Sequence, residues 1–508
     1  MTPTPPNIVL IMADQLAPQF TGTYGHPLVK TPHIDALAAR GTRFDAAYCN
    51  SPLCAPSRFS FMAGQLITNI GAWDNATEFP ASIPTFAHYL RTMGYKTCLS
   101  GKMHFVGPDQ LHGFEERVTT DVYPSDYAWT PDWENHEQRI DKWYHNMDSV
   151  TEAGIGAATF QLDYDDEVAF FAKRRIMDFA RYKEQPFCLV ASFIHPHDPY
   201  VARQKWWDLY DSAEIDPPKI TIPRDQQDPF SGRLMDGIEA TETSGTPEEI
   251  RDARHAYYAN TSYFDGMVGE IVETLKDAQL LDNTIIIVTS DHGDMLGERS
   301  LWYKMNFFEH SARVPLVMAG PGIAQQAVPN ACSLVDLLPT MIDIAATNGA
   351  QKPAYGQPID GRSLLPVAMG QDDTDDVAVG EYCAEMTSHP VYMIRRGKYK
   401  YIHCDSDAPL LYDLEADPDE MNNLAEDPAH TEVAAAFSAE VASRWDSTAI
   451  RQQVIASQRQ RRAVHAAMGA GKLVSWDYNP PRDASQEYVR NHMDWTVAAA
   501  TTRFPPLE

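Results

Sequence analysis

Long apolar runs are absent from this sequence of 508 residues. A transmembrane helix needs about 20 consecutive apolar residues, so we expect no membrane span. The first residues, Met1 to Pro6, include no basic side chain, and the apolar stretch Ile8–Met12 that follows is short and leads to Asp14. This pattern predicts a buried strand rather than a signal peptide.

Paired cysteines are also absent. The chain has 7 cysteines, none of them in a Cys-x-x-Cys pair. Disulfide frameworks and structural zinc sites use closely spaced cysteines, so the pattern argues against both. Scattered free cysteines favour a reducing, cytoplasmic location.

Basic charge is scarce, with 41 Lys and Arg against 70 Asp and Glu and a net charge of −29. Such a protein is poorly suited to the phosphates of nucleic acids or to anionic membranes. The acidity suits either a cationic ligand or simple solubility, and composition does not separate the two. With 44% hydrophobic residues, the chain is long enough for one large domain and a smaller one.

Polar residues follow three short apolar runs that are typical of strands buried on both faces. Open α/β sheets place their chemistry at the carboxyl ends of such strands. The sequence therefore predicts an α/β fold with a site at these strand ends. The residues concerned are Asp14 and Gln15 after 7–12, His195 and His197 after 187–194, and Asp291 and His292 after 284–290.

Cys54 lies in the segment Ser51–Arg58, just before a predicted helix that ends at Gly64. A free cysteine is most often a buried structural residue, which is the plain interpretation. At a helix N-terminus, however, backbone N–H groups and the helix dipole favour a bound anion. Arg58, one turn into the helix, can reach the same anion with its planar fork.

The segment Cys54-Ala-Pro-Ser-Arg58 resembles the C-x-P-S-R signature of the formylglycine-dependent sulfatases of the alkaline-phosphatase-like superfamily. Further runs resemble that family in the expected chain order: 31–41, 101–104, 195–199, 291–293, 304–315 and 413–424. The resemblance implies an α/β fold with a mixed, mostly parallel sheet between helices. It also implies a catalytic domain over 1–370, a smaller C-terminal α+β subdomain over 371–470 with a helix at 432–462, and an extended tail over 471–508.

The same resemblance implies a set of catalytic residues. A maturation enzyme would oxidise Cys54 to formylglycine, whose hydrate attacks sulfur to give a sulfo-enzyme intermediate. Arg58, Lys102 and Lys304 would bind the sulfate, His197 would protonate the leaving group, and His104 would act as base in the breakdown of the intermediate.

A divalent metal ion is implied as well, with Asp14, Cys54, Asp291 and His292 as its ligands. Gln15 stands where the family usually has a second acid, so its part in binding the metal is open. Mostly oxygen ligands favour Ca²⁺, with Mg²⁺ or Mn²⁺ as alternatives, over Zn²⁺.

Within this family the chain looks most similar to the choline-sulfatases, on runs such as 107–116, 195–201, 293–298 and 490–493. That implies hydrolysis of choline-O-sulfate by a homotetramer in which the tail docks on a neighbouring subunit. Aromatic faces and carboxylates recognise a quaternary ammonium. The resemblance nominates Trp129 and Glu381 for this, with Asn75, His145 and Asn146 as polar neighbours.

Two alternatives remain open at this point. One is a phosphonate monoester or phosphodiester hydrolase of the same superfamily. The other is a binder of quaternary ammonium ligands in which Cys54 stays a thiol. A cysteine hydrolase would need a thiolate activated by a neighbouring histidine, and no histidine adjoins Cys54 in the sequence.

Overall fold

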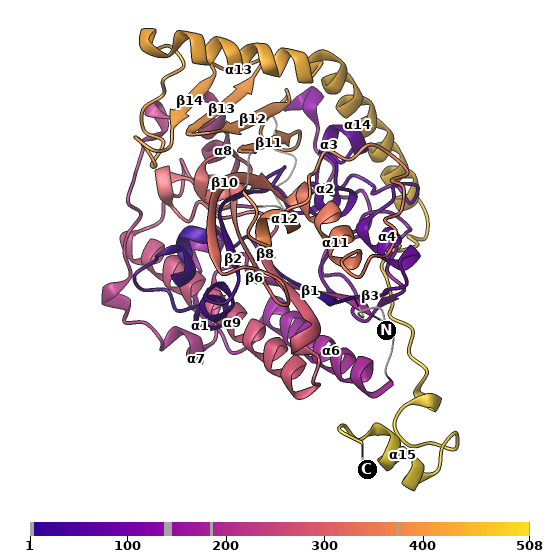
Figure 1. Cartoon of the computed structure of the whole chain (residues 1–508). Helices are drawn as coiled ribbons and strands as arrows, with labels where there is room; N and C mark the ends of the chain where they lie inside the picture. Colours follow the sequence, from indigo (N-terminus) through magenta and orange to yellow (C-terminus); the bar gives the residue numbers. More distant parts are fainter. Residues whose placement is uncertain (1–4, 137–144, 183–185, 373–374, 507–508) are drawn as a thin grey trace.

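A mixed sheet of eight strands forms the centre of the large domain (Figure 1), in the order β10-β2-β9-β8-β1-β6-β3-β4. The structure is a computed structural model that describes residues 5–136, 145–182, 186–372 and 375–506. Strand β9 runs antiparallel to both its neighbours, whereas the other pairs are parallel. The mostly parallel sheet predicted from the sequence is therefore confirmed. Its strands are β1 Asn7–Asp14, β2 Thr42–Tyr48, β3 Lys96–Gly101, β4 Glu116–Arg117, β6 Phe187–Pro196, β8 Thr284–Ser290, β9 Arg313–Ala319 and β10 Gln326–Ser333.

Helices cover both faces of this sheet, which explains why β1 is buried along its whole length. Side chains alternate between the faces of a strand. Leu10 and Met12 join one core cluster, whereas Val9 and Ile11 join the other. The first cluster includes residues of α2 Cys54–Ala63, α4 Phe86–Thr92 and α11 Leu337–Ala345, and the second includes residues of α1 Pro32–Ala38, α6 Phe160–Tyr182 and α9 Pro247–Asp277.

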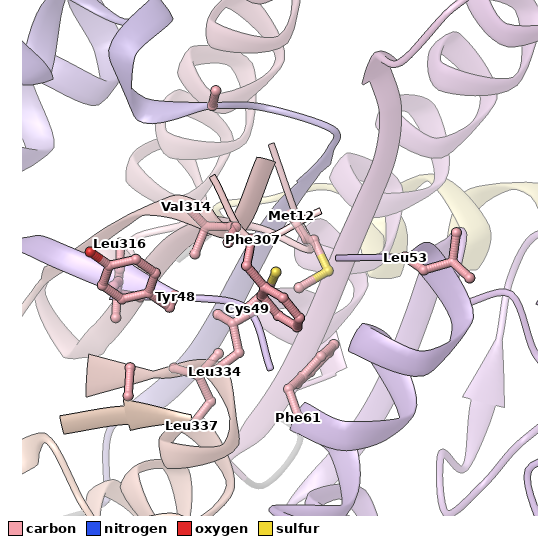
Figure 2. Packing of buried hydrophobic residues seen from close by; sticks show 14 of the residues in the cluster. Met12, Tyr48, Cys49, Leu53, Phe61, Phe307, Val314, Leu316, Leu334 and Leu337 are labelled. Carbon is pink, nitrogen blue, oxygen red and sulfur yellow. The ribbon is translucent and has the colours of Figure 1, made fainter. Parts of the chain in front are cut away.

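The segment around Cys54 is fixed by the first cluster. Cys49, Leu53 and Phe61 pack with Met12 of β1 and with Phe307 (Figure 2). All ten residues of α2 are buried. The position of Cys54 is thus set by core packing on both sides of it in the sequence.

A smaller antiparallel sheet follows in the C-terminal part, in the order β11-β12-β13-β14. Its strands are β11 Val377–Tyr382, β12 Val391–Arg396, β13 Tyr399–Cys404 and β14 Leu410–Asp413. The single helix predicted over 432–462 is wrong, since the chain forms α13 Thr431–Arg444 and α14 Ser447–Gly469. Trp445 is extended between them, and the Asp446 side chain caps α14 by accepting from the N–H of Ala449.

Short elements complete the part of the chain that the structure describes. The helices are α3 Ile67–Ile70, α5 Asp148–Thr151, α7 Gln204–Trp207, α8 Pro229–Gly237, α10 Glu309–Ala312 and α12 Leu365–Ala368, and β5 Gly154–Ile155 pairs with β7 Val201–Ala202. None of the described helices has the length and apolar character to cross a bilayer.

After α14 the chain runs as an extended tail to α15, Trp495–Thr502, beyond the end of α6 (Figure 1). The first part of the tail lies on its own chain: Trp476 packs edge-on against Tyr127, and Ser125 donates to the carboxylate of Asp477. Further along, Tyr488 is 68% exposed and Trp495 is 72% exposed. The tail thus leaves large apolar side chains in solvent.

Gly101 ends β3 next to Lys102, and its backbone φ is +113°. A Cβ atom there would lie 1.9 Å from the carbonyl oxygen of Ser192 on β6. We expect Gly101→Ala to lower the free energy of unfolding by roughly 2–4 kcal/mol, because backbone strain and overpacking add. Denaturant unfolding followed by tryptophan fluorescence measures the loss.

Gly25→Ala is the matched control, since Gly25 also has a positive φ, +97°, but nothing within 4 Å of its Cβ position. Strain alone should cost about 1–2 kcal/mol there. Equal losses in the two variants would contradict the close approach of β3 and β6.

Candidate active site

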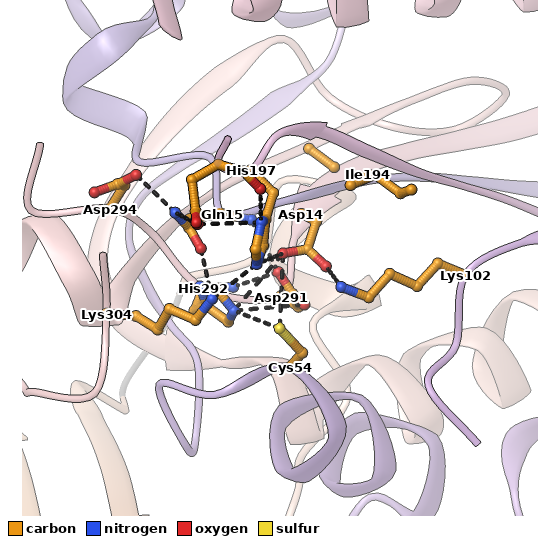
Figure 3. A network of polar contacts seen from close by, with 12 residues as sticks. Asp14, Gln15, Cys54, Lys102, Ile194, His197, Asp291, His292, Asp294 and Lys304 are labelled. Atoms are coloured by element: carbon orange, nitrogen blue, oxygen red, sulfur yellow. Dashed lines mark hydrogen bonds and ion pairs between the residues drawn. The ribbon is translucent and has the colours of Figure 1, made fainter. Parts of the chain in front are cut away.

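Residues far apart in the sequence meet at the carboxyl ends of β1, β3, β6 and β8 (Figure 3). Asp14 ends β1, Lys102 follows β3, His197 follows β6, and Asp291 follows β8. Cys54 faces them as the first residue of α2. Because these strands are parallel, their ends lie on one edge of the sheet, which is why the predicted strand-end residues come together.

Two buried carboxylates and two buried cations form the centre of the site. The Arg58 guanidinium donates to Asp14 at 3.0 Å and to Asp291 at 2.8 Å. Lys102 Nζ donates to the same Asp14 oxygen as Arg58 does. Although burial acts to raise the pKa of the Asp14 carboxyl, Lys102 and its other cationic neighbours hold that pKa well below its usual range. Asp14 is therefore an anion here.

Four buried side chains offer ligand atoms that all lie within 4.8 Å of one another: Asp14, Cys54, Asp291 and His292. With Nδ1 of His292 donating to the Gly293 carbonyl at 3.0 Å, its Nε2 is the nitrogen with a free lone pair. Nε2 points to Cys54 Sγ at 3.3 Å. Two carboxylates and one imidazole suit a divalent cation of hard to borderline character.

Gln15 does not belong to this set of four. Its backbone φ is +66°, and its side-chain oxygen accepts from Lys304 Nζ at 2.6 Å. Its amide nitrogen donates to Asp294 at 2.7 Å and to Asp198 at 3.2 Å. The side-chain amide of Gln15 is thus hydrogen-bonded to Lys304 and Asp294.

Lys304, which binds the Gln15 side chain, also contacts His197. Lys304 Nζ lies 2.9 Å from His197 Nε2, and His197 Nδ1 lies 2.5 Å from the carbonyl oxygen of Asp198. Burial and the charge of Lys304 lower the pKa of His197 well below its usual value. His197 is therefore neutral, and its Nε2 accepts a hydrogen bond from the ammonium group of Lys304.

His104 borders the site on the other side. It is fully buried, and neither ring nitrogen has a hydrogen-bond partner among the described residues. Burial, together with Lys102, lowers the pKa of His104 to about 3. Its ring lies 5.8 Å from that of Trp129 and 5.0 Å from that of Tyr123.

Tyr123 is the residue that the sequence analysis missed. Its ring centre lies 4.3 Å from Lys102 Nζ and 5.2 Å from the Trp129 ring. Tyr123 stands in a loop and in none of the motifs, and the aromatic residues close to it in the sequence, Tyr127 and Trp129, are the signal that could have indicated it. Tyr123 and Trp129 together form an aromatic wall beside the cations.

The predicted polar neighbours are placed in different ways. His145 Nδ1 lies 3.2 Å from Asp198, and its ring stacks on that of Tyr303. Asn75 accepts from the N–H of Ala55, the residue after Cys54, at 2.9 Å. The side-chain oxygen of Asn146 caps the N–H of Asp148, and its backbone carbonyl accepts from the Tyr303 hydroxyl.

Glu381 is not brought into this cluster. Its two carboxylate oxygens accept from Thr68 and from the indole N–H of Trp445. Burial raises the pKa of Glu381 to about 7. The prediction that Glu381 faces the substrate is therefore corrected: its oxygens bind Trp445 and α3, so it joins elements of the fold.

The sequence profile of the Sulfatase family matches residues 6–347. The chain belongs to the sulfatase family. Profiles described as "Choline sulfatase enzyme C terminal" and "N-sulphoglucosamine sulphohydrolase, C-terminal" match residues 452–504 and 297–446. The sulfatase is 48% identical to the choline-sulfatase of Rhizobium meliloti over 513 residues, which cover 99% of each chain. It is 31% identical to human arylsulfatase K over 447 residues, 83% of this chain and 79% of that one.

Solved structures show the same fold. A 2-O GAG sulfatase superposes with a TM-score of 0.70 at 24% identity, covering 86% of this sulfatase and 91% of that chain. The phosphonate monoester hydrolase of Agrobacterium radiobacter superposes with a TM-score of 0.69 at 24% identity, covering 88% and 96%. At such low identity these likenesses establish the fold alone.

The contact between Cys54 and His292 raises the question of a cysteine nucleophile, which the sequence alone did not suggest. Such chemistry needs a thiolate. Burial and the nearby charge of Asp14 instead raise the pKa of the Cys54 thiol to about 11. The surroundings therefore keep an unmodified Cys54 protonated and do not favour a cysteine hydrolase.

The charges at the centre of the site make Arg58 important for stability. Arg58→Met would leave two buried carboxylates with less compensation, so we expect it to reduce the free energy of unfolding by about 3–5 kcal/mol. Arg43→Met is the control, because Arg43 pairs with Asp45 at a partly exposed position, where a loss below about 1 kcal/mol is expected. Similar losses in urea unfolding would contradict the central role of Arg58.

Proposed function

We propose that this sulfatase hydrolyses choline-O-sulfate to choline and sulfate. The observation that carries the proposal is the aromatic wall of Tyr123 and Trp129, in which the Tyr123 ring lies directly beside the buried Lys102. A sulfate group suits Lys102 and Lys304, and a quaternary ammonium, which has no N–H, suits aromatic faces. The 48% identity to a choline-sulfatase along the full chain supports the same substrate.

The nucleophile in this proposal is formylglycine, made from Cys54 by a formylglycine-generating or sulfatase-maturating enzyme. Asp14, Asp291, His292 and residue 54 would hold one divalent cation, Ca²⁺ in preference to Mg²⁺ or Mn²⁺, because two of the protein ligands are carboxylates. When bound, the cation and the hydrated aldehyde supply an acidified hydroxyl for attack on sulfur.

Three buried cations would bind and orient the sulfate group. Lys102 and Lys304 are at most 1% exposed, and Arg58 is fully buried. Fixed cations in a site that excludes water stabilise the charge that develops in the transition state, without the cost of reorganising solvent. The dipole of α2 adds a favourable potential for the same anion at the N-terminus of the helix.

The proton for the departing choline oxygen would come from the Lys304–His197 pair. In the resting site Lys304 offers a proton to Nε2 of a neutral His197. When the sulfate ester enters, its negative charge favours protonation of the imidazole. On the other side, His104 is neutral and has no hydrogen-bond partner among the described residues. The negative charge of the bound sulfate group would raise its pKa and so allow it to take up a proton when the sulfated residue 54 breaks down.

The exposed apolar residues of the tail support a homotetramer in which the tail docks on a neighbouring subunit. Val474, Tyr488, Trp495 and Val497 are each at least 50% exposed, and exposed apolar surface of this kind suits contact with another protein surface. We also retain a reducing, cytoplasmic location as part of the proposal, in keeping with seven free, buried cysteines.

Choline-O-sulfate and its carbon isostere, 3,3-dimethylbutyl sulfate, differ only in the charge of the quaternary centre. We expect kcat/KM to be higher for choline-O-sulfate. Trp129→Leu should lower kcat/KM about 2- to 30-fold for the choline ester, in line with about 0.5–2 kcal/mol for a cation–π contact. The same change should leave the isostere nearly unaffected.

Trp207→Leu serves as the control, because Trp207 is also partly exposed but stacks on His255, outside the site. Equal kcat/KM values for choline-O-sulfate and its isostere would contradict recognition of the choline cation. The chain would still act as a sulfatase. A preference for a phosphonate monoester of similar size would favour the phosphonate hydrolase alternative. If no substrate is hydrolysed, the mass of the peptide that contains residue 54 should be measured. The mass of unmodified cysteine would favour the alternative of a protein that only binds quaternary ammonium ligands.

The proton-donor assignment predicts a dependence on the leaving group. Lys304→Met and His197→Gln should lower kcat/KM for choline-O-sulfate by about 10²–10⁴, the usual contribution of general acid catalysis. For 4-nitrophenyl sulfate, whose leaving group needs no proton, the loss should be much smaller. Lys102→Met is the comparison: it should affect both substrates alike, and a similar pattern for Lys304→Met would refute its role in proton transfer.

A further inference from the structure

A second polar cavity, of about 810 Å³, lies where the large sheet meets the small one. Tyr48 at the end of β2, Arg313 at the start of β9 and Arg395 on β12 line it. None of the residues around it belongs to the catalytic cluster described above. The mechanism proposed for the sulfatase makes no use of this cavity.

Arg395 is the unusual residue of the cavity. It is 9% exposed, and its Nη1 has no hydrogen-bond partner among the described residues. Its Nε donates to the Tyr48 hydroxyl at 3.3 Å, but no carboxylate in the described part of the chain lies within the 4.0 Å of an ion pair. A buried guanidinium without an anionic partner is costly.

Arg313 reaches the same place. It stands directly opposite Tyr48 in the pairing of β2 and β9. Its Nε is buried and also has no hydrogen-bond partner in the described structure. Its one carboxylate neighbour there, Glu309, is 3.8 Å away and accepts a closer bond, 3.0 Å, from Lys400. Tyr48 thus lies near both guanidinium groups, and its hydroxyl donates to Glu309 at 2.9 Å.

Most of the acidic residues around the cavity already have cationic partners, and none of them accepts a hydrogen bond from Arg395 Nη1 or Arg313 Nε in the described structure. The pairs are Asp45 with Arg43, Asp216 and Glu298 with Arg254, Glu309 with Lys400, and Asp419 with Lys219. Glu214 is exposed. Arg254 and Lys400 are each shared by two carboxylates, since Lys400 also pairs with Glu420. The buried donors left without a hydrogen-bond partner among the described residues are Arg395 Nη1 and Arg313 Nε.

We propose that this cavity binds a tetrahedral oxyanion, of the sulfate or phosphate class, between Arg313 and Arg395. The two donors belong to different guanidinium groups on different strands. A single carboxylate suits one planar fork, whereas a tetrahedral anion directs its oxygens to donors from several sides. Because this site is separate from the catalytic centre, the proposal stands whether or not the chain cleaves choline-O-sulfate.

Isothermal titration calorimetry of the full chain with sodium sulfate, sodium phosphate or sodium acetate, at constant ionic strength in chloride, tests the proposal. We expect the wild type to bind sulfate or phosphate at a site that Arg395→Met weakens at least tenfold. Acetate should show no such difference, and comparing sulfate with phosphate identifies the preferred anion. Arg396→Met is the matched control, because Arg396 is the next residue of β12, is exposed and pairs with Glu440.

Anions bound at the catalytic centre would contribute equally in both variants, so the difference between Arg395→Met and Arg396→Met isolates the second site. The proposal is overturned if the two variants titrate alike with all three anions. If Arg395→Met does not fold, crystals of the wild type soaked in selenate decide the question. An anomalous selenium peak is expected in the cavity, with a selenate oxygen within hydrogen-bonding distance of Arg395 Nη1, and a peak at the catalytic centre alone would refute the site.

Discussion

The pairing of Arg58 with Asp14 and Asp291 is the interaction on which the rest of the site depends. Two carboxylates buried at the ends of neighbouring strands would each cost several kcal/mol without a cation. Arg58 supplies the cation from the first turn of α2, the helix that also begins with Cys54. The same contacts that neutralise the sheet edge therefore fix the helix start. Any shift of α2 that moved Cys54 would also separate these buried charges.

The sequence predicted the elements whose signals are local. The strand at 284–290 matches β8, because an apolar run between polar residues admits few structures. The break at Trp445 was not predicted, because it depends on a partner elsewhere in the chain. The indole of Trp445 donates to Glu381 on β11, and no pattern within 432–462 reveals that bond.

The site shows the same limit. Residues at strand ends were predictable, since parallel strands gather their carboxyl ends at one edge. The use of the Gln15 amide was not, because its partners Asp294 and Lys304 lie more than 270 residues away. Tyr123 escaped notice because it stands in a loop without periodicity. Glu381 was misplaced because a strand-end acid in sequence gives no indication of which side chains its oxygens bind.

The burial of Cys54 has a consequence for how the protein is made. Cys54 is 1% exposed, and every residue of the helix it begins is buried. A maturation enzyme must hold this cysteine and its neighbours in its own active site, which the folded chain does not allow. Oxidation at Cys54, as proposed, thus has to precede folding of the large domain. The yield of active protein would then depend on the kinetic competition, during synthesis, between modification of Cys54 and folding of the core.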